Sequence, residues 1–386
     1  MSQFFAERIA RRTALAAIAA IGIALAGCGM GMATRTTPAP QINHPDFAFV
    51  ANTSSNTVSA FEIDPESGML FSVAGSPFNA GSAPEFMAAD SAGKFLFVAN
   101  SNSNNISAFS IDGTTGVLTA VPGSPFATGA APKGIAIVTS ANLLFVADNG
   151  SNDIAGFQID PSTGALAPVP GSPFPAGASP IGAATDALGN FLYVTNLSAN
   201  TVSAFSIDTQ SGTLAPINGS PFATGSTPIG VAADPNGKFL YVGNHMTDTV
   251  SPFNIDPLNG TLTQVAALPA PSLNCSSTCH VNPLRVAIAP KARFAYVADV
   301  GANTLSAFSI DNGALSQIAS PVATGQHPFG VALDPAGKFV YVVNKLDNSI
   351  SAFSVDATTG GVTPLPGSPF SSNGNGPDGI VITSQP

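Results

Sequence analysis

One short strand motif recurs seven times along the chain and constrains its fold more than any other feature. Each copy is a run of apolar residues that closes on Asn or Asp. The copies are FAFVAN ending at Asn52, FLFVAN at Asn100, LLFVAD at Asp148, FLYVTN at Asn196, FLYVGN at Asn244, FAYVAD at Asp299 and FVYVVN at Asn344. These ends lie 48, 48, 48, 48, 55 and 45 residues apart. A strand that recurs at a period of this length is the signature of a β-propeller with one blade per repeat, so we predict an all-β, seven-bladed β-propeller.

Each repeat carries signals for four antiparallel strands. In the stretch 228–268, the turn DPNG at 234–237 separates a first strand from the second, and DPLNG at 256–260 separates the third from a fourth. An Asp closes the third strand of every repeat, where its side chain can accept hydrogen bonds from the turn backbone. These residues are Asp64, Asp112, Asp160, Asp208, Asp256, Asp311 and Asp356. Seven separate turns explain this row of carboxylates better than a metal site does.

A Gly-Ser-Pro-Phe element recurs in five repeats. Its aromatic residues are Phe78, Phe126, Phe174, Phe222 and Phe370. We interpret these rings as wedges between adjacent blades, with stacking on carbohydrate as the alternative.

The two ends of the repeat array complement each other. The first repeat opens directly at FAFVAN and lacks the preceding Pro-x-Gly strand, whereas residues 377–383 (PDGIVIT) supply such a strand with nothing after it. The C-terminal strand is therefore predicted to pair with the N-terminal blade and close the ring, which removes the exposed sheet edges.

The first residues read as a targeting segment. Arg8, Arg11 and Arg12 precede an apolar run that ends in LAGC at 25–28. This tetrad resembles a bacterial lipobox, so we predict a lipoprotein signal peptide over 1–27, lipid on Cys28, a flexible tether over 28–45 and the propeller over 46–386. An ordinary signal peptide with an incidental Cys is the alternative, and the paired arginines hint weakly at twin-arginine export. The expected location is outside the cytoplasm, on the outer membrane if the host is Gram-negative.

The net negative charge of the chain limits the kinds of molecule that it can bind. The whole chain has a formal net charge of −10, and without residues 1–27 it keeps 9 Lys and Arg against 21 Asp and Glu. A surface this acidic disfavours nucleic acid and anionic membranes, so membrane contact is expected through the lipid alone. A small molecule is the expected partner, and a protein partner stays open.

Two further cysteines, Cys275 and Cys279, lie in the longest interval between repeats, followed by His280. An oxidising compartment favours a disulfide between them. The spacing also approximates a haem-attachment motif, but it has one residue too many and no obvious axial ligand. A zinc site that adds His280 and the remote His245 is disfavoured because oxidised cysteines cannot bind metal. No cofactor or metal is predicted.

Candidate site residues are those that depart from the repeat, because a feature present seven times cannot mark one site. In propellers the first strand of each blade lines the central channel. The residues after the entry Pro are Glu85, Lys133, Ile181, Ile229, Leu284, Phe329 and Asp378. One position further on, five copies have Gly and the others have Phe86 and Arg285, while His327 stands out before its Pro.

Around the closed ring these departures form two arcs. Blades 6, 7, 1, 2 and 3 supply the polar residues, which are Arg285, His327, Asp378, Glu85 and Lys133, and blades 4 and 5 supply Ile181 and Ile229. Such a mouth suits a small molecule with an apolar and an oxygenated side. The alternative is that the charges only pair with one another. His245, Asp248 and Lys345 are expected to join from the rim.

The repeats also resemble a known family. Residues 193–196 (YVTN), 237–242 (GKFLYV) and 201–205 (TVSAF) resemble the YVTN-repeat propellers. The array over 46–383 is similar to the lactonase-type seven-bladed propellers, which include 6-phosphogluconolactonase-like enzymes. No motif of a catalytic residue of that family is matched here.

The resemblance implies a carboxylic ester hydrolase that opens a lactone ring. In that case Glu85, Asp378 or His327 is expected to act as base, with Arg285 and Lys133 polarising the carbonyl. An exported acidic protein fits a phosphosugar lactone poorly. The other hypothesis is a non-catalytic, envelope-anchored propeller that binds a small molecule or a protein.

Overall fold

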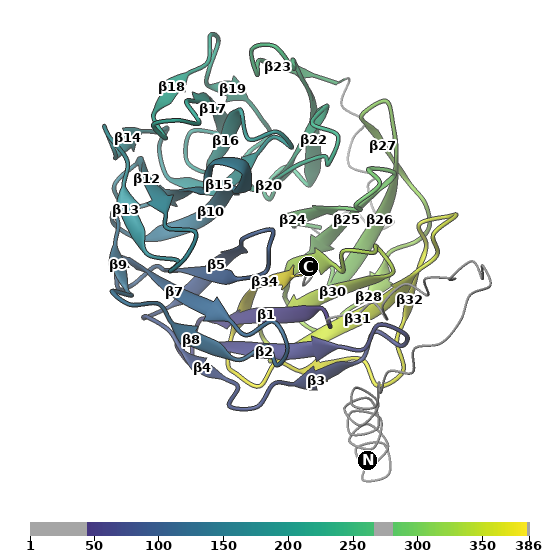
Figure 1. Ribbon diagram of the computed structural model, residues 1–386. Helices are drawn as coiled ribbons and strands as arrows, with labels where there is room; N and C mark the ends of the chain where they lie inside the picture. Colours follow the sequence, from purple (N-terminus) through teal and green to yellow (C-terminus); the bar gives the residue numbers. More distant parts are fainter. Residues whose placement is uncertain (1–44, 266–280, 384–386) are drawn as a thin grey trace, which may run out of the picture. The chain divides into compact units, whose positions relative to one another are not determined.

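Seven antiparallel sheets arranged in a ring make up the part of the chain that the structure describes (Figure 1). In this computed structural model, residues 45–265 and 281–383 are described. Each sheet is one blade with four main strands, and the first strand of every blade contacts those of its neighbours around the centre. The predicted seven-bladed propeller is confirmed.

The strands are numbered along the chain and grouped here from the centre outwards. The inner strands of blades 1 to 7 are β34 (Pro377–Thr383), β5 (Pro84–Ala89), β10 (Pro132–Val138), β15 (Pro180–Thr185), β20 (Pro228–Ala233), β24 (Pro283–Ile288) and β29 (Pro328–Leu333). The second strands are β1 (Phe47–Asn52), β6 (Phe95–Asn100), β11 (Leu143–Asp148), β16 (Phe191–Asn196), β21 (Phe239–Asn244), β25 (Phe294–Asp299) and β30 (Phe339–Asn344).

The outer strands follow in the same order. The third strands are β2 (Thr57–Ile63), β7 (Asn105–Ile111), β12 (Asp153–Ile159), β17 (Thr201–Ile207), β22 (Thr249–Ile255), β26 (Thr304–Asp311) and β31 (Ser349–Val355). The fourth strands are β3 (Leu70–Ser72), β8 (Leu118–Ala120), β13 (Leu166–Pro168), β18 (Leu214–Pro216), β23 (Leu262–Gln264), β27 (Ala314–Gln317) and β32 (Val362–Pro364). A single 3₁₀ turn, η1 (Thr139–Ala141), also lies in the described part of the chain.

A short fifth strand, which the sequence analysis did not foresee, pairs with the third strand of six blades. These strands are β4 (Phe78–Asn79), β9 (Phe126–Ala127), β14 (Phe174–Pro175), β19 (Phe222–Ala223), β28 (Val322–Ala323) and β33 (Phe370–Ser371). Five of them begin with the Phe of a Gly-Ser-Pro-Phe element. Phe126, for example, packs against a cluster that joins blades 2 and 3, so the predicted wedge role is confirmed.

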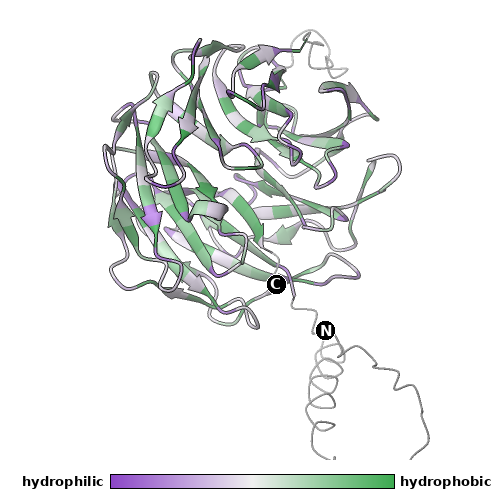
Figure 2. Ribbon diagram, turned by 45° about the horizontal axis from the view of Figure 1, so that its top comes forward, coloured by the Kyte–Doolittle hydropathy of each residue, from purple (hydrophilic) through white to green (hydrophobic). Residues whose placement is uncertain are grey.

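The hydrophobic core lies between adjacent blades. Every residue of β1, β6, β11, β16, β25 and β30 is buried. Side chains alternate between the two faces of a strand. Each second strand therefore supplies residues to the clusters on both sides, so Phe47 and Phe49 pack towards blade 2 while Ala48 and Val50 pack towards blade 7. Figure 2 shows hydrophobic residues along the strands of the blades. Burial on both faces accounts for the near-continuous apolar runs.

The ring closes through the last strand. β34 pairs antiparallel with β1, with Phe47 opposite Thr383 and Val50 opposite Ile380. Blade 1 is thus built from both ends of the described chain, as predicted from the sequence.

The aspartates that close the third strands serve the turns. Asp112 Oδ1 accepts hydrogen bonds from the backbone N–H groups of Thr114 and Thr115, and Asp160 and Asp356 do the same in their blades. These bonds lower the pKa of the Asp112 carboxyl, because they favour its charged form. In the described ranges, no three His, Cys, Asp or Glu side chains are placed to hold a metal ion.

Two of the seven second strands end in Asp where the other five end in Asn. The side-chain amide of Asn100 donates to Ser107, whereas the Asp299 carboxylate accepts from Ser306 at 2.6 Å. Asp299 is 2% exposed, and burial raises the pKa of its carboxyl to about 7. The folded protein therefore binds a proton at this site between about pH 4 and pH 7, where the unfolded chain does not.

We expect Asp299→Asn to stabilise the protein at neutral and alkaline pH. Stability of the native protein falls as pH rises from about 4 to 7, because the charged carboxylate is buried, whereas Asn does not titrate. The stability gain of the variant over the native protein should grow by about 4 kcal/mol from pH 4 to pH 8. Urea unfolding at pH 4, 6 and 8 measures this difference. Asp311→Asn, an exposed position in the same blade, is the control, and an equal gain there would contradict the explanation.

Several sequence predictions lie outside the described residues. These are the signal peptide, the lipid on Cys28, the tether and the disulfide between Cys275 and Cys279. In the described part of the chain, no helix has the length and apolar character needed to span a membrane.

Candidate active site

The candidate site is built from the segments that enter the inner strands. The residue before each entry Pro has a left-handed backbone, with φ between 51° and 65°. The pairing of each inner strand with its neighbour then shifts register just after the Pro, as between Pro180 and Ala183. A bulge of this kind re-aims side chains at the rim of a sheet. It places the residues after the seven prolines around one mouth of the channel.

Glycine follows these residues in five blades because the backbones of neighbouring blades come very close there. A Cβ at Gly182 would collide with the carbonyl oxygen of Ile229, and one at Gly379 with that of Glu85. The remaining two positions hold Phe86 and Arg285.

These two exceptions contact each other. The guanidinium carbon of Arg285, from blade 6, lies 3.8 Å from the centre of the Phe86 ring, from blade 2. It also lies 5.6 Å from the Phe329 ring of blade 7. Blades 6 and 2 are separated by blades 7 and 1, so Arg285 reaches across the mouth and stacks between aromatic rings. Cation–π contacts of a poorly hydrated guanidinium are favourable in such a place.

Asp378 anchors the positive charges. The Nη2 atom of Arg285 lies 2.9 Å from Asp378 Oδ1, and the Nζ atom of Lys345 lies 2.7 Å from Oδ2. The Asp378 side chain is fully buried, and the Arg285 side chain is 15% exposed. Burial raises the pKa of the Asp378 carboxyl, while the charges of Arg285 and Lys345 lower it. A buried carboxylate needs such partners, because an unpaired charge there is costly.

Glu85 and Lys133 form a second ion pair on blades 2 and 3. Lys133 Nζ lies 2.6 Å from both carboxylate oxygens of Glu85. The hydroxyl of Ser101 donates to Glu85 Oε1 at 2.8 Å. Both oxygens of each carboxylate at the mouth, Glu85 and Asp378, therefore accept charge-assisted hydrogen bonds.

His327 lies beside this network without joining it. Its ring stacks on Phe329 at a centroid distance of 6.0 Å, and Lys345 Nζ lies 4.5 Å from the same Phe329 ring. Burial lowers the pKa of the His327 imidazole, as do the charges of Lys345 and His245. Its Nδ1 atom is buried and has no hydrogen-bond partner in the described part of the chain. The imidazole is therefore neutral at pH 7 and able to accept a proton.

The rim holds a second histidine. His245 Nε2 lies 3.1 Å from the side-chain nitrogen of Asn282, and the Asn282 backbone N–H donates to Asp248 Oδ1 at 2.7 Å. Burial lowers the pKa of His245 as well. Of the rim residues expected from the sequence, Lys345 enters the ion-pair network, while His245 and Asp248 bind Asn282.

Two residues that bind side chains of the mouth were not predicted from the sequence. Ser101 follows Asn100, in the same place in its repeat as Lys345 and His245, and Asn282 precedes Pro283 just as His327 precedes Pro328. A comparison across all blades of the residue after the second strand and of the residue before the entry Pro would have identified both residues. The half-buried Ile181 and Ile229 occupy the equivalent entry positions in blades 4 and 5.

The mouth combines three cations with two carboxylates in a strongly acidic protein. Arg285, Lys133 and Lys345 carry the positive charge, and the neutral His327 adjoins them. Such a set can bind or stabilise negative charge on an oxygen while the imidazole accepts a proton.

Comparison with known proteins identifies the family. The model of the family described as "Lactonase, 7-bladed beta-propeller" matches residues 39–128, 174–278 and 271–373. The chain belongs to this lactonase family of seven-bladed propellers. No curated protein matches the chain.

Solved structures share the fold at low sequence identity. A candidate 6-phosphogluconolactonase from Bacteroides fragilis is 19% identical, with a TM-score of 0.77 over 90% of this chain and 100% of that one. One from Bacteroides uniformis is 18% identical, with a TM-score of 0.76 over 88% and 99%. The periplasmic gluconolactonase of Pseudomonas aeruginosa is 20% identical, with a TM-score of 0.74 over 88% and 100%. At this level of identity the likeness shows a shared fold.

Proposed function

We propose that the protein is a lactone hydrolase whose active site is the mouth formed by blades 6, 7 and 1. The observation that carries the proposal is the neutral imidazole of His327 beside the Lys345–Asp378–Arg285 ion pairs. Membership of the lactonase family supports the reaction class.

Each residue has a role in this reaction. His327 accepts a proton from a water molecule, whose oxygen attacks the lactone carbonyl carbon. The carbonyl oxygen gains negative charge, which Lys345 and Arg285 stabilise. The ring C–O bond then breaks, and the alkoxide takes the proton back from His327 to leave a hydroxy acid, which releases a proton to water and becomes the hydroxycarboxylate.

The ion pairs favour His327 over the two carboxylates as the base. Both oxygens of Asp378 and of Glu85 already accept hydrogen bonds from cations, which take up the positions that a water molecule would contact. His327 instead carries no charge at pH 7, and among the described residues its half-buried ring makes no hydrogen bond to these ion pairs. We assign Asp378 to holding Arg285 and Lys345 in place, and Lys133 to holding Glu85.

A panel of γ- and δ-lactones tests the proposal. The purified protein should open at least one of them, and His327→Gln should lower kcat by about 100-fold or more. Because the pKa of His327 is lowered, kcat/KM should hold down to pH 6.5 and fall only below it. His245→Gln, which changes the other histidine of the mouth, is the control and should keep most of the activity.

One observation favours a second function. The charges of the mouth already neutralise each other through ion pairs, which fits a non-catalytic propeller that binds a small molecule or a protein partner. Absence of turnover on every lactone would overturn the hydrolase and leave this function.

A further inference from the structure

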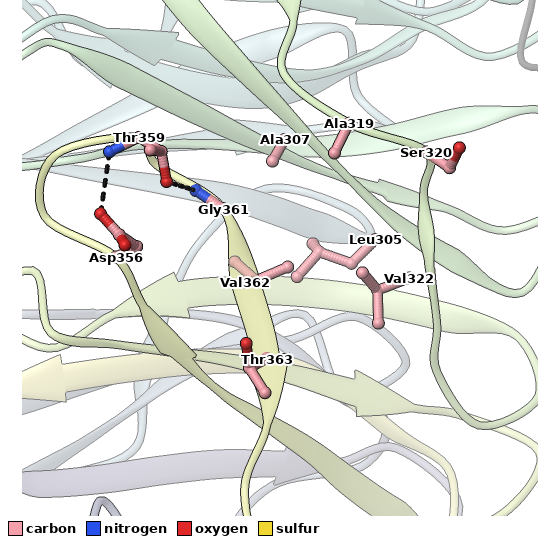
Figure 3. A pocket seen from close by; sticks show the side chains of 10 residues that line it. All are labelled: Leu305, Ala307, Ala319, Ser320, Val322, Asp356, Thr359, Gly361, Val362 and Thr363. Carbon is pink, nitrogen blue, oxygen red and sulfur yellow. Dashed lines mark hydrogen bonds between the residues drawn. The ribbon is translucent and has the colours of Figure 1, made fainter.

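A pocket of about 240 Å³ opens between the outer strands of blades 6 and 7 (Figure 3). The side chains of Leu305, Val322 and Val362 point towards one another in it, while Ser320 and Asp356 lie at its edges. None of these residues belongs to the channel mouth, so the pocket is separate from the proposed active site.

The pocket lies where other blades hold a phenyl ring. In blade 2, Phe126 is paired with Ile106 and packs in the cluster that contains Ala108 and Ala165. In blade 6 the residue at this register is Val322, which is paired with Leu305. The shorter side chain leaves the space of the missing ring open.

On the side of the pocket formed by blade 7, a side chain is also missing. The residue after the Gly of the third turn has a side chain in the other six blades, where it is Met69, Val117, Ala165, Thr213, Thr261 or Ala314. In blade 7 it is Gly361, and a Cβ built there would meet only the Thr359 hydroxyl at 3.4 Å. Two independent departures from the repeat thus enlarge the same space.

One hydrogen bond of the repeat is not made beside the pocket, although Ser320 keeps the position of the serine that makes it in other blades. In blade 2 the Ser124 hydroxyl accepts a hydrogen bond from the Ala108 N–H at 2.9 Å, and four other blades repeat this bond. In blade 6 no hydroxyl of the described residues accepts from the Ala307 N–H, which is the equivalent group. Buried N–H groups without an acceptor are costly, so a ligand that supplies one gains affinity.

We propose that this rim pocket binds a small, neutral, one-ring aromatic molecule that carries a hydroxyl or carbonyl oxygen. Its ring takes the place of the absent Phe side chain, and its oxygen accepts from Ala307. An engineered apolar cavity of about 150 Å³ is known to bind benzene, so the volume suffices.

The strand pairing and the charge next to the pocket disfavour two classes of ligand, extended peptides and anions. A peptide cannot add as a strand, because β28 already pairs with β26 along this edge. Backbone hydrogen bonds from Thr358 and Thr359 lower the pKa of Asp356, which is charged at neutral pH and repels anions. A neutral small molecule meets both conditions.

Titration of the ¹³C-methyl-labelled protein with benzyl alcohol tests the proposal. The methyl signals of Leu305, Val322 and Val362 should shift and saturate, with a Kd of about 1 mM or tighter. Benzoate, which has the same ring but a negative charge, should bind at least tenfold more weakly.

Two variants fill the pocket from opposite sides. Val322→Phe and Gly361→Val should each weaken benzyl alcohol binding at least tenfold, whereas Thr213→Val, at the same turn position in blade 4, should not. Shifts that do not saturate, or native affinity in Gly361→Val, would overturn the proposal. If Val322→Phe fails to fold, Gly361→Val alone decides the outcome.

Discussion

A protein shortened to end at Gly376 should fail to form a stable ring. The deletion removes β34, which is the inner strand of blade 1, and leaves one edge of β1 unpaired. All six residues of β1 are buried in the complete protein. The lost burial of Ile380, Val381 and Ile382, together with the lost strand pairing, costs on the order of 5 kcal/mol. That is comparable to the whole stability of a typical domain.

Thermal unfolding followed by circular dichroism, with size-exclusion chromatography, measures this effect. We expect aggregation or a melting temperature lower by about 7 °C or more. A chain that ends at Thr383 keeps the whole strand and serves as the control. If the two proteins melt alike, β34 does not close the ring.

Replacement of Arg285 by Ala should have the largest effect at the candidate site. It removes one of two cations from a fully buried carboxylate and the side chain that stacks on Phe86 and Phe329. If the mouth opens lactones, kcat/KM should fall by about 100-fold or more, since a group that stabilises the oxyanion is lost. Stability should also fall, by about 3 kcal/mol, because Asp378 keeps only Lys345.

Kinetics on a lactone that the native protein opens, together with thermal melting, separate these two effects. Arg285→Lys keeps the charge but loses the planar fork, and it should recover part of the stability and little of the activity. Arg293→Ala is a matched control, since this exposed arginine of the same blade also lies over a ring, that of Phe294 at 5.2 Å. Native kinetics in Arg285→Ala would remove Arg285 from the mechanism.

The architecture could be predicted because its signals are local and repeated. A strand that ends in Asn or Asp, a turn closed by Asp and Gly, and an entry Pro all report the conformation of a few neighbouring residues. Closure followed from comparison of the two ends of the array. The short fifth strands escaped notice, since two-residue segments such as Phe126–Ala127 carry no periodicity.

The charged residues and His327 of the mouth could be predicted, but Ser101, Asn282 and the pairing of the charges could not. Subtraction of the repeat selected Glu85, Lys133, Arg285, His327 and Asp378 as positions. The contact of Arg285 with Phe86 depends on a long side chain that crosses between non-adjacent blades. The choice of Asp378 as partner by both Arg285 and Lys345 depends likewise on side-chain conformations that no spacing encodes.

Because β34 pairs with β1, the first and last strands of the described chain lie in the same blade. The order of the blades along the chain therefore depends only on the point at which the ring is interrupted. Phe47 and Thr383 lie opposite each other in the same sheet, so a short linker between them would make the ring covalently continuous. New ends could then be placed in any exposed turn between blades. This protein can therefore be rearranged by circular permutation while every interface between blades is kept.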